Sequence, residues 1–198
     1  MAFSKEQNPD IKQIFSKLRK SPMITFVVEK RTKSELLGKE TKAPGTIYVS
    51  SNKFRWDTAG DEKSKIIYDG SVIWTIQDPQ KGFKAPPQIT KVKMSKKSEG
   101  QLFLNSLFQE NFNGQFQLTK KEKIDGSWVF FLKPLKKNVG IEELKIKIGE
   151  ERDIEEIDYV DEVQNKTSVI ISKTNLSNKI DLKLFQYYPP KGSQVNEL

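Results

Sequence analysis

Hydrophobic residues recur with a helical period in two segments of the chain. In the first, residues 9–20, apolar residues lie at i, i+3, i+4 and i+7, which predicts an amphipathic helix. These residues are Ile11, Ile14, Phe15 and Leu18. Ahead of them, Asn8-Pro9-Asp10 supplies an N-cap, a proline at the first helical position and an early acid. Ser21-Pro22 ends the predicted helix.

A second helix is predicted over residues 98–112. Ser98 and Gln101 have the spacing of a capping box, in which each residue caps a backbone group of the other. Apolar residues then fall on one helical face, at Phe103, Leu104, Leu107, Phe108 and Phe112. An amphipathic helix needs an apolar surface to lie on, so both helices are expected to cover another element.

Outside these two segments the hydrophobic period is two, which predicts β-strands. The clearest hairpin joins Ile66–Tyr68 to Val72–Ile76, because Asp69-Gly70 between two apolar runs is the strongest short hairpin signal. A charged connection is predicted over residues 33–45. The predicted strands span residues 23–33, 45–50, 53–57, 66–68, 72–76, 88–94, 115–120, 128–132, 144–148, 154–163, 167–173 and 180–188.

This arrangement predicts a mainly β (α+β) fold. About eleven short strands, with turn signals every 8–15 residues and no βαβ rhythm, indicate an antiparallel barrel or a strongly curved sheet. Many strands carry Lys or Glu on one face and large apolar residues on the other. The two helices are the only predicted cover for the apolar face. We expect a single domain over residues 1–198.

Composition argues against an enzyme. The chain contains no Cys and no His, which excludes Ser-His-Asp and Cys-His triads, disulfides, zinc fingers and imidazole metal sites. The acidic pairs Glu142/Glu143, Glu150/Glu151 and Glu155/Glu156 are neighbours in strand-like sequence, so their side chains are expected on opposite faces. No glycine-rich phosphate loop or calcium loop occurs. We therefore expect no catalysis, no cofactor and no metal.

The charge is distributed unevenly along the chain. Residues 1–140 carry a formal net charge of +12, and residues 141–198 carry −4, for a total of +8. Solvated strand faces would account for this pattern. An anionic partner would account for it as well: membrane head groups, an acidic protein patch, or nucleic acid. No apolar run is long enough to span a membrane, and residues 1–20 lack the apolar core of a signal peptide.

Eight large apolar residues lie on the predicted helix and strand faces. They are Phe15, Phe26, Phe54, Trp56, Trp74, Leu104, Leu107 and Phe108. One interpretation is an ordinary core. The other is a cavity between the helices and the curved sheet, lined by these residues and able to take an apolar ligand.

Several strings in order resemble the family of periplasmic outer-membrane lipoprotein carrier proteins (LolA). The first are Gly45–Ser50, Phe54-Arg55-Trp56, Ile67–Trp74 with its Asp-Gly turn, and Asp78-Pro79. The last are Thr167–Ser172, Asn178-Lys179-Ile180, Phe185-Gln186-Tyr187 and the proline-rich segment of residues 189–195. Each string alone is weakly specific, but the ordered set extends over residues 8–197.

The resemblance implies an incomplete antiparallel barrel of eleven strands, with helices as a lid over an apolar cavity. It implies a monomeric periplasmic chaperone, whose signal peptide is absent from this sequence. Such a carrier takes acylated lipoproteins from an inner-membrane ABC transporter to an outer-membrane lipoprotein receptor. By motif, Phe54, Trp56 and Trp74 match aromatic positions of the family, and Phe15 matches an apolar position of its first helix.

Two positions depart from the family pattern. Relatives often carry an arginine, just before the Phe-x-Trp motif, that bonds to the lid and holds it shut. Ser50–Lys53 occupies that stretch in this chain, and Arg55 is not the equivalent position. A turn glycine of the family is also missing from Asp161–Asn165, where Asn165 is expected to adopt the positive φ instead.

Two alternatives stay open. A lipoprotein receptor of the same fold (LolB-like) would be anchored through an N-terminal Cys and would carry an exposed apolar loop; Leu36-Leu37 is the candidate for that loop. A nucleic-acid-binding β-barrel would place aromatic residues on an exposed basic face. The strand patterns place the aromatic residues opposite the lysines, which favours the carrier.

Overall fold

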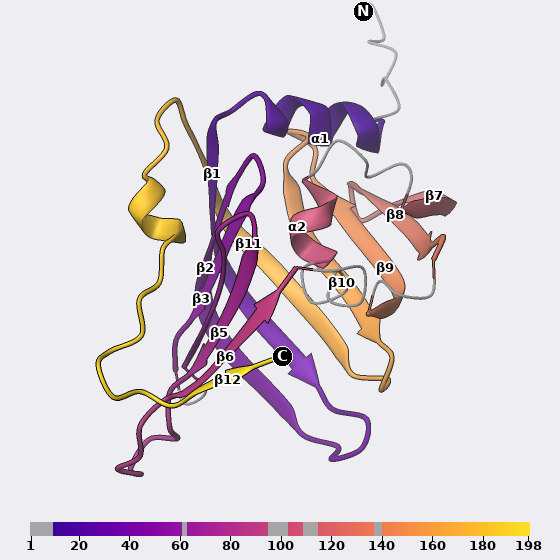
Figure 1. Cartoon of the computed structure of the whole chain (residues 1–198). Helices are drawn as coiled ribbons and strands as arrows, with labels where there is room; N and C mark the ends of the chain where they lie inside the picture. Colours follow the sequence, from indigo (N-terminus) through magenta and orange to yellow (C-terminus); the bar gives the residue numbers. More distant parts are fainter. Residues whose placement is uncertain (1–9, 61–62, 95–102, 109–114, 137–139) are drawn as a thin grey trace, which may run out of the picture.

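The computed structural model describes residues 10–60, 63–94, 103–108, 115–136 and 140–198. Its described strands form one twelve-stranded sheet in the order β12-β6-β5-β4-β3-β2-β1-β11-β10-β9-β8-β7, antiparallel except for the β12–β6 pair (Figure 1). Strands β12 and β7 lie at the two edges and do not pair, so the barrel is incomplete, as predicted. The count is twelve rather than eleven.

The strands follow the period-two segments of the sequence. Their bounds are Met23–Lys33 (β1), Glu40–Ser50 (β2), Lys53–Thr58 (β3), Ser64–Tyr68 (β4), Val72–Gln77 (β5), Gln88–Lys93 (β6), Phe116–Ile124 (β7), Ser127–Pro134 (β8), Ile141–Ile148 (β9), Ile154–Asp161 (β10), Lys166–Ser177 (β11) and Val195–Glu197 (β12). Strand β2 begins five residues before the predicted start, because its polar residues continue to pair with β1 as far as Glu40 opposite Lys33.

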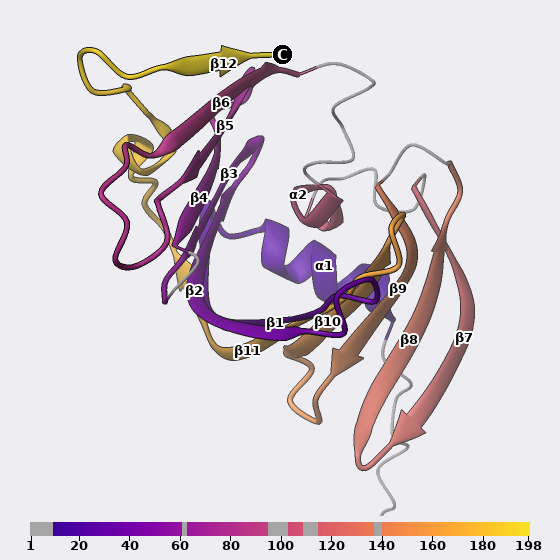
Figure 2. The ribbon, with the colours of Figure 1, turned by 90° about the horizontal axis from the view of Figure 1, so that it is seen from below.

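The long strands β1 and β11 form the base of a U-shaped sheet, and the other strands form its two arms (Figure 2). The register of this pair shifts between Val27 and Val28, where a bulge interrupts the ladder. Bulges bend the strand that carries them and increase its twist. The bulge therefore accompanies the strong curvature of the base.

Short turns hold the arms together. The predicted β4–β5 hairpin is confirmed: Gly70 has φ +108°, and the Asp69 carboxylate accepts hydrogen bonds from the Ser71 and Val72 backbone amides at 2.8 and 2.9 Å. Partial burial raises the pKa of Asp69, but these hydrogen bonds outweigh it and hold the pKa below its usual value. Asp125-Gly126 makes a similar turn between β7 and β8, with positive φ at both residues.

The turn between β10 and β11 corrects one prediction. Gln164, not Asn165, has the positive φ, at +66°. The Asp161 carboxylate accepts hydrogen bonds from the backbone amides of Val163 and Asn165 and from the Asn165 side chain, at 2.8–3.0 Å. These bonds fix the backbone of the turn, so a residue other than glycine is tolerated there.

Of the two helical segments, residues 103–107 lie inside the U, and residues 11–19 lie across one end of it (Figures 1 and 2). Helix α1 spans Ile11–Arg19, and the Asp10 side chain caps it by accepting a hydrogen bond from the Lys12 amide at 2.9 Å. Asp10 is thus the N-cap, and the predicted Asn8-Pro9 lies outside the described residues. Of the helix predicted over residues 98–112, the structure describes α2, Phe103–Leu107, followed by Phe108. Ser98, Gln101 and Phe112 lie outside the described part. A lid of several long helices is therefore not established by the fold.

The strand predicted over residues 180–188 is wrong. Asp181 accepts a hydrogen bond from the Lys183 amide at 3.0 Å and caps a 3₁₀ turn, η4, at Leu182–Phe185. After this turn the chain runs along the outer face of the β1–β6 arm and ends as β12 beside β6 (Figure 1). The alternating apolar residues predicted a strand, but the local hydrogen bond to the Asp181 side chain stabilises a 3₁₀ turn instead.

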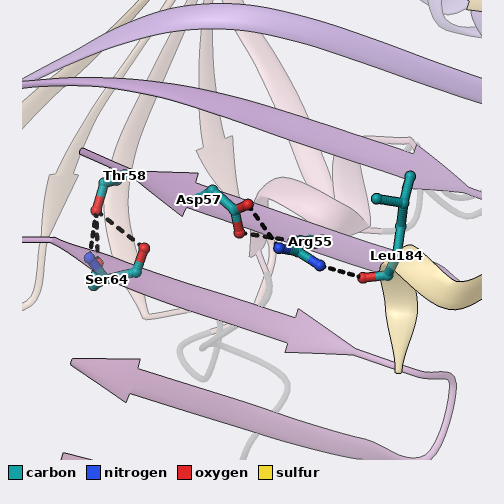
Figure 3. A network of polar contacts seen from close by, with 5 residues as sticks. All are labelled: Arg55, Asp57, Thr58, Ser64 and Leu184. Carbon is teal, nitrogen blue, oxygen red and sulfur yellow. Dashed lines mark hydrogen bonds and ion pairs between the residues drawn. The ribbon is translucent and has the colours of Figure 1, made fainter. Parts of the chain in front are cut away.

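Arg55 attaches this C-terminal segment to the sheet. Its guanidinium makes a bidentate contact with the Asp57 carboxylate, both bonds at 2.8 Å, and donates to the Leu184 carbonyl at 2.9 Å (Figure 3). The next residue, Phe185, is buried, and Tyr187 packs edge-on against Trp74 with ring centroids 5.4 Å apart. The outer face of this arm is therefore covered by the chain itself.

Replacing Arg55 tests this attachment. Arg55→Ala leaves the partly buried Leu184 carbonyl and Asp57 carboxylate without these partners, and should lower the free energy of unfolding by about 1–3 kcal/mol. Limited proteolysis should cut within residues 178–194 faster than in the wild type. Arg31→Ala is the control, since Arg31 pairs with Glu29 in an exposed position. Equal proteolysis of the two variants would contradict the role of Arg55.

Candidate functional site

The concave face of the sheet carries the main apolar cluster. In β1, Ile24, Phe26 and Val28 alternate onto this face and are at most 3% exposed, whereas Val27 is 40% exposed on the other. The other strands contribute their inward residues in the same way. Among these are Ile47, Val49, Phe54, Trp56, Ile73, Phe130, Leu132, Leu144, Ile146, Ile148, Ile157 and Val169.

The two helical segments complete this cluster. The predicted stripe of α1 (Ile11, Ile14, Phe15 and Leu18) is buried against it. Leu104 and Leu107 of α2 are also buried in it. Phe108 joins three elements: its ring centroid lies 5.5 Å from that of Phe15 in an edge-on contact and 5.3 Å from that of Phe26 in β1. The helices are thus held to the sheet by apolar and aromatic contacts.

Seven of the eight residues singled out in the sequence meet in this cluster. They are Phe15, Phe26, Phe54, Trp56, Leu104, Leu107 and Phe108. Trp74 does not join them. Because Ile73 faces the interior, its neighbour Trp74 faces the opposite side of β5, where it packs with Ile67, Ile76, Ile89 and Tyr187. The structure therefore places Trp74 outside this cluster, and a lipid-binding cavity lined by the other seven residues stays a prediction.

A cleft of about 440 Å³ is lined by residues of strands β1 to β5, at the end of these strands that lies away from α1. We call it the Lys30 cleft; its lining is Lys30, Lys39, Glu40, Thr41, Lys42, Ala43, Thr58, Ser64, Ile66, Thr75 and Gln77. Lys30 follows Phe26 and Val28 on the inner face of β1, and its Nζ lies 5.6 Å from the ring centroid of Trp56. The cleft therefore borders the apolar cluster.

Hydroxyl groups line the Lys30 cleft on neighbouring strands. The Thr58 and Ser64 hydroxyls lie 2.7 Å apart on β3 and β4 (Figure 3). Trp56 is 6% exposed, and its indole Nε1 makes no hydrogen bond to any described residue. Gly45 allows this indole to pack closely, because a Cβ there would lie 3.2 Å from Nε1 and 2.6 Å from the Asp57 carbonyl oxygen. The sequence analysis did not predict this cleft. It could have been found from the alternation of β1, which places Lys30 on the same face of the sheet as Phe26.

The other arm places polar groups on both of its faces. On the inner side, burial raises the pKa of Tyr159 to about 12, which keeps its hydroxyl neutral next to the apolar cluster. A second cleft, of about 460 Å³, is lined by residues of β7–β11 that include Phe131, Lys145 and Asp158. Lys145 and Asp158 form an ion pair at 2.5 Å. Burial and the charge of Asp158 raise the pKa of neighbouring Glu156.

The described residues contain no helix long and apolar enough to cross a membrane. Within the same residues, no group of three or more Asp or Glu side chains is placed to hold a metal ion.

Comparison with known proteins identifies the family. In structure, the chain is similar to an uncharacterised conserved protein from Thermus thermophilus, with a TM-score of 0.52 at 12% identity over 94% of this chain and 98% of that one. A LolA superfamily protein from Nitrosomonas europaea gives a TM-score of 0.46 at 13% identity over 91% and 99%. No curated protein sequence matches. The sequence matches the outer membrane lipoprotein carrier protein family over residues 30–188, which include the end of β1 and all of β2 to β11, and the chain belongs to this family, LolA.

Proposed function

We propose that this protein is a periplasmic chaperone that binds the acyl chains of lipoproteins and carries them from the inner membrane to the outer membrane. Membership of the LolA family supports this proposal. The observation that carries it is the construction of the interior. Among the described residues, a large apolar face of one sheet is covered by two helical segments rather than by a second sheet.

Transport of an acylated protein through water needs such an interior. Each exposed methylene of an acyl chain costs about 0.8 kcal/mol in water, so a lipoprotein with several long chains does not cross an aqueous compartment unaided. The carrier must also release its cargo. Binding by apolar contacts alone, without covalent chemistry or a cofactor, meets both requirements.

The helical segments are the part of the interior that acyl chains would displace. In its described part, α2 is held to the sheet by the burial of Leu104, Leu107 and Phe108. Acyl chains offer the sheet the same kind of contact. In this proposal α1 and α2 are the lid, and the cavity opens as they move away from Phe26, Phe54 and Trp56.

Arg55 does not close this lid. Its guanidinium is bound on the outer face to Asp57 and Leu184 (Figure 3). The closing contacts we propose instead are the two aromatic contacts of Phe108 with Phe15 and Phe26.

The remaining parts of the proposal come from the family. The partners are acylated lipoproteins, an inner-membrane lipoprotein-releasing ABC transporter and an outer-membrane lipoprotein receptor, and the protein acts as a monomer. Nucleic acid is disfavoured, because the aromatic residues Phe26, Phe54 and Trp56 are at most 6% exposed and offer bases no stacking surface.

A receptor role is the second candidate, and one observation favours it. Leu36 and Leu37, at the tip of the β1–β2 hairpin, are 90% and 74% exposed. Lys33 and Lys39 flank them. An apolar tip between lysines suits insertion into an anionic membrane, as a receptor that works at a membrane surface would need.

Phe108→Ala tests the closing contacts. The substitution removes the aromatic side chain that joins α1 and β1 to the α2 segment, and should lower the free energy of unfolding by about 3–5 kcal/mol in urea titrations. The control Phe83→Ala changes a phenylalanine that is 70% exposed and should cost less than about 0.5 kcal/mol. A small effect of Phe108→Ala would mean that these contacts do not hold the interior closed.

Two tryptophans on opposite faces of the sheet test where acyl chains bind. In a Trp74→Phe/Trp128→Phe variant, only Trp56 emits, and a palmitoylated peptide brominated on its acyl chain should quench that emission. In a Trp56→Phe/Trp128→Phe variant, only Trp74 emits, and the same peptide should leave it unchanged, because Trp74 packs outside with Tyr187. The unacylated peptide is the ligand control. Quenching of Trp74 but not of Trp56 would exclude the interior as the acyl site.

Vesicle sedimentation separates the receptor role from the carrier role. For a receptor, Leu36→Ser/Leu37→Ser should weaken binding to vesicles with anionic lipid about tenfold or more, since burying one leucine contributes about 1.5–3 kcal/mol. Val163→Ser is the control, because Val163 is 70% exposed in another turn. If neither the wild type nor the variants bind vesicles, the receptor role is excluded.

A further inference from the structure

We propose that the turn between β5 and β6, at Phe83, is a second membrane contact, which together with Leu36 and Leu37 docks one end of the β1–β6 arm on an anionic lipid bilayer. The inference rests on the receptor role considered above, which concerns Leu36 and Leu37 alone, and adds a second contact point and an orientation. Phe83 is 70% exposed, and the neighbouring Lys81 and Lys84 are exposed as well.

The two turns lie at the same end of the arm. We call residues 34–39 the Leu36 turn and residues 78–87 the Phe83 turn. Neighbouring strands from β1 to β6 are antiparallel, so β1 and β5 run in the same direction and end at the same edge. Figure 1 shows both turns at the end of the arm away from α1. One flat surface can therefore contact the Leu36 turn, which follows β1, and the Phe83 turn, which follows β5.

The turns at the opposite end of the same strands are polar. Ser51-Asn52 joins β2 to β3, and Asp69-Gly70-Ser71 joins β4 to β5. Such residues are the usual choice for tight turns in contact with water. The two ends of the arm thus differ in character, and the end with the Leu36 and Phe83 turns carries the exposed apolar side chains.

The backbone of each turn is fixed by hydrogen bonds. In the Leu36 turn, the Ser34 amide donates to the Lys39 carbonyl at 2.9 Å, and in the Phe83 turn, the Phe83 amide donates to the Gln80 carbonyl at 3.0 Å. Each turn also contains a glycine with positive φ, at +58° and +96° respectively. The exposure of the leucines and of Phe83 is therefore a property of two defined turns.

Lysines flank both apolar tips. Lys33 and Lys39 lie on either side of the leucines, and Lys81 and Lys84 lie on either side of Phe83. All four are exposed, and none of them makes an ion pair with a residue that the structure describes. Their charges are available to an anionic surface that meets this end of the arm.

The acidic residues of the two turns do not cancel this charge. They are Glu35 and Asp78, and Asp78 already pairs with Lys63 at 3.6 Å. The turn between β10 and β11, in the other arm, differs in this respect: Val163 is also 70% exposed, but its neighbour Glu162 is acidic. An anionic surface is therefore expected to contact the β1–β6 arm and not this turn.

A lipid bilayer fits these features. Apolar side chains can enter the boundary of the acyl region while the lysines stay among the head groups, and each of these contacts adds affinity. Two separate projections at one end of a sheet suit a flat and deformable surface. In this orientation α1 points away from the membrane, and the Lys30 cleft, whose lining includes Lys39 and Gln77, lies near the bilayer.

Sedimentation with vesicles of phosphatidylglycerol and phosphatidylcholine tests the second contact. Phe83→Ser should weaken binding of the intact protein about tenfold, because it removes an apolar side chain that the bilayer buries. Val163→Ser is the matched control, with the same exposed fraction in the other arm, and should bind as the wild type does. Combining Phe83→Ser with Leu36→Ser/Leu37→Ser should weaken binding about a hundredfold or more, since the two turns contribute separately.

The lysines are tested in the same assay at low salt. Lys81→Gln/Lys84→Gln should weaken binding about tenfold, and vesicles of phosphatidylcholine alone should show no difference between this variant and the wild type. Lys12→Gln/Lys17→Gln is the control, because these exposed lysines of α1 lie at the other end of the arm. It changes the net charge by the same amount and should leave binding unchanged.

Each other outcome has one meaning. If Leu36→Ser/Leu37→Ser weakens binding and Phe83→Ser does not, the second contact is overturned and the receptor role stands. Equal weakening by the two lysine variants, or by Val163→Ser and Phe83→Ser, would overturn the proposed orientation. No binding of the wild type to any vesicle would overturn both the docking surface and the receptor role, and would leave the two turns as a surface for a protein. The carrier function is independent of all these results, because the quenching of Trp56 tests it.

Discussion

The structure depends on one constraint: a curved sheet has an apolar concave face, and the described residues form no second sheet to cover it. Side-chain alternation brings Phe26, Phe54 and Trp56 to that face, and the curvature of the β1–β11 base turns it inward. Two helical segments satisfy the constraint by covering this face. The fold and the proposed activity therefore have the same origin, because whatever covers this face must be apolar, and acyl chains are apolar.

The segments that cover the two faces of the sheet are held by different kinds of interaction. On the outer face of the sheet, Arg55 binds the C-terminal segment through a directional hydrogen bond to the Leu184 carbonyl. On the inner face, Phe108 holds α1 and β1 through aromatic and apolar contacts. Directional hydrogen bonds are costly to leave unmade, whereas apolar contacts are readily replaced by others of the same kind. The inner cover is thus the part of the structure suited to exchange.

Local pattern was enough to predict most of the fold. The stripe of α1, the Asp69-Gly70 hairpin and most of the strands follow from periodicity alone. Residues 180–188 were misassigned because the capping bond of Asp181 is a local hydrogen bond that competes with a strand-like pattern. The parallel pairing of β12 with β6 is a contact between distant segments, which no local pattern encodes.

The candidate site was only partly predictable. The family motif grouped Trp74 with Trp56. Ile73 faces the interior, so its neighbour Trp74 lies on the outer face of the sheet. Lys30 was not singled out, because its contact with the Trp56 ring joins two different strands. A polar residue on the inner face of a curved sheet can be predicted only if the alternation of a strand is extended beyond its last apolar residue.

Hydrogen exchange of the intact protein, with and without a palmitoylated peptide, tests the central claim most directly. If acyl chains replace the helical cover, the backbone amides of α2, residues 103–107, should exchange faster when the peptide is bound, while those of β1 and β11 keep their protection. Protection of α2 equal to that of β1 and β11 in both states would contradict the account, because the interior would then be a permanent core.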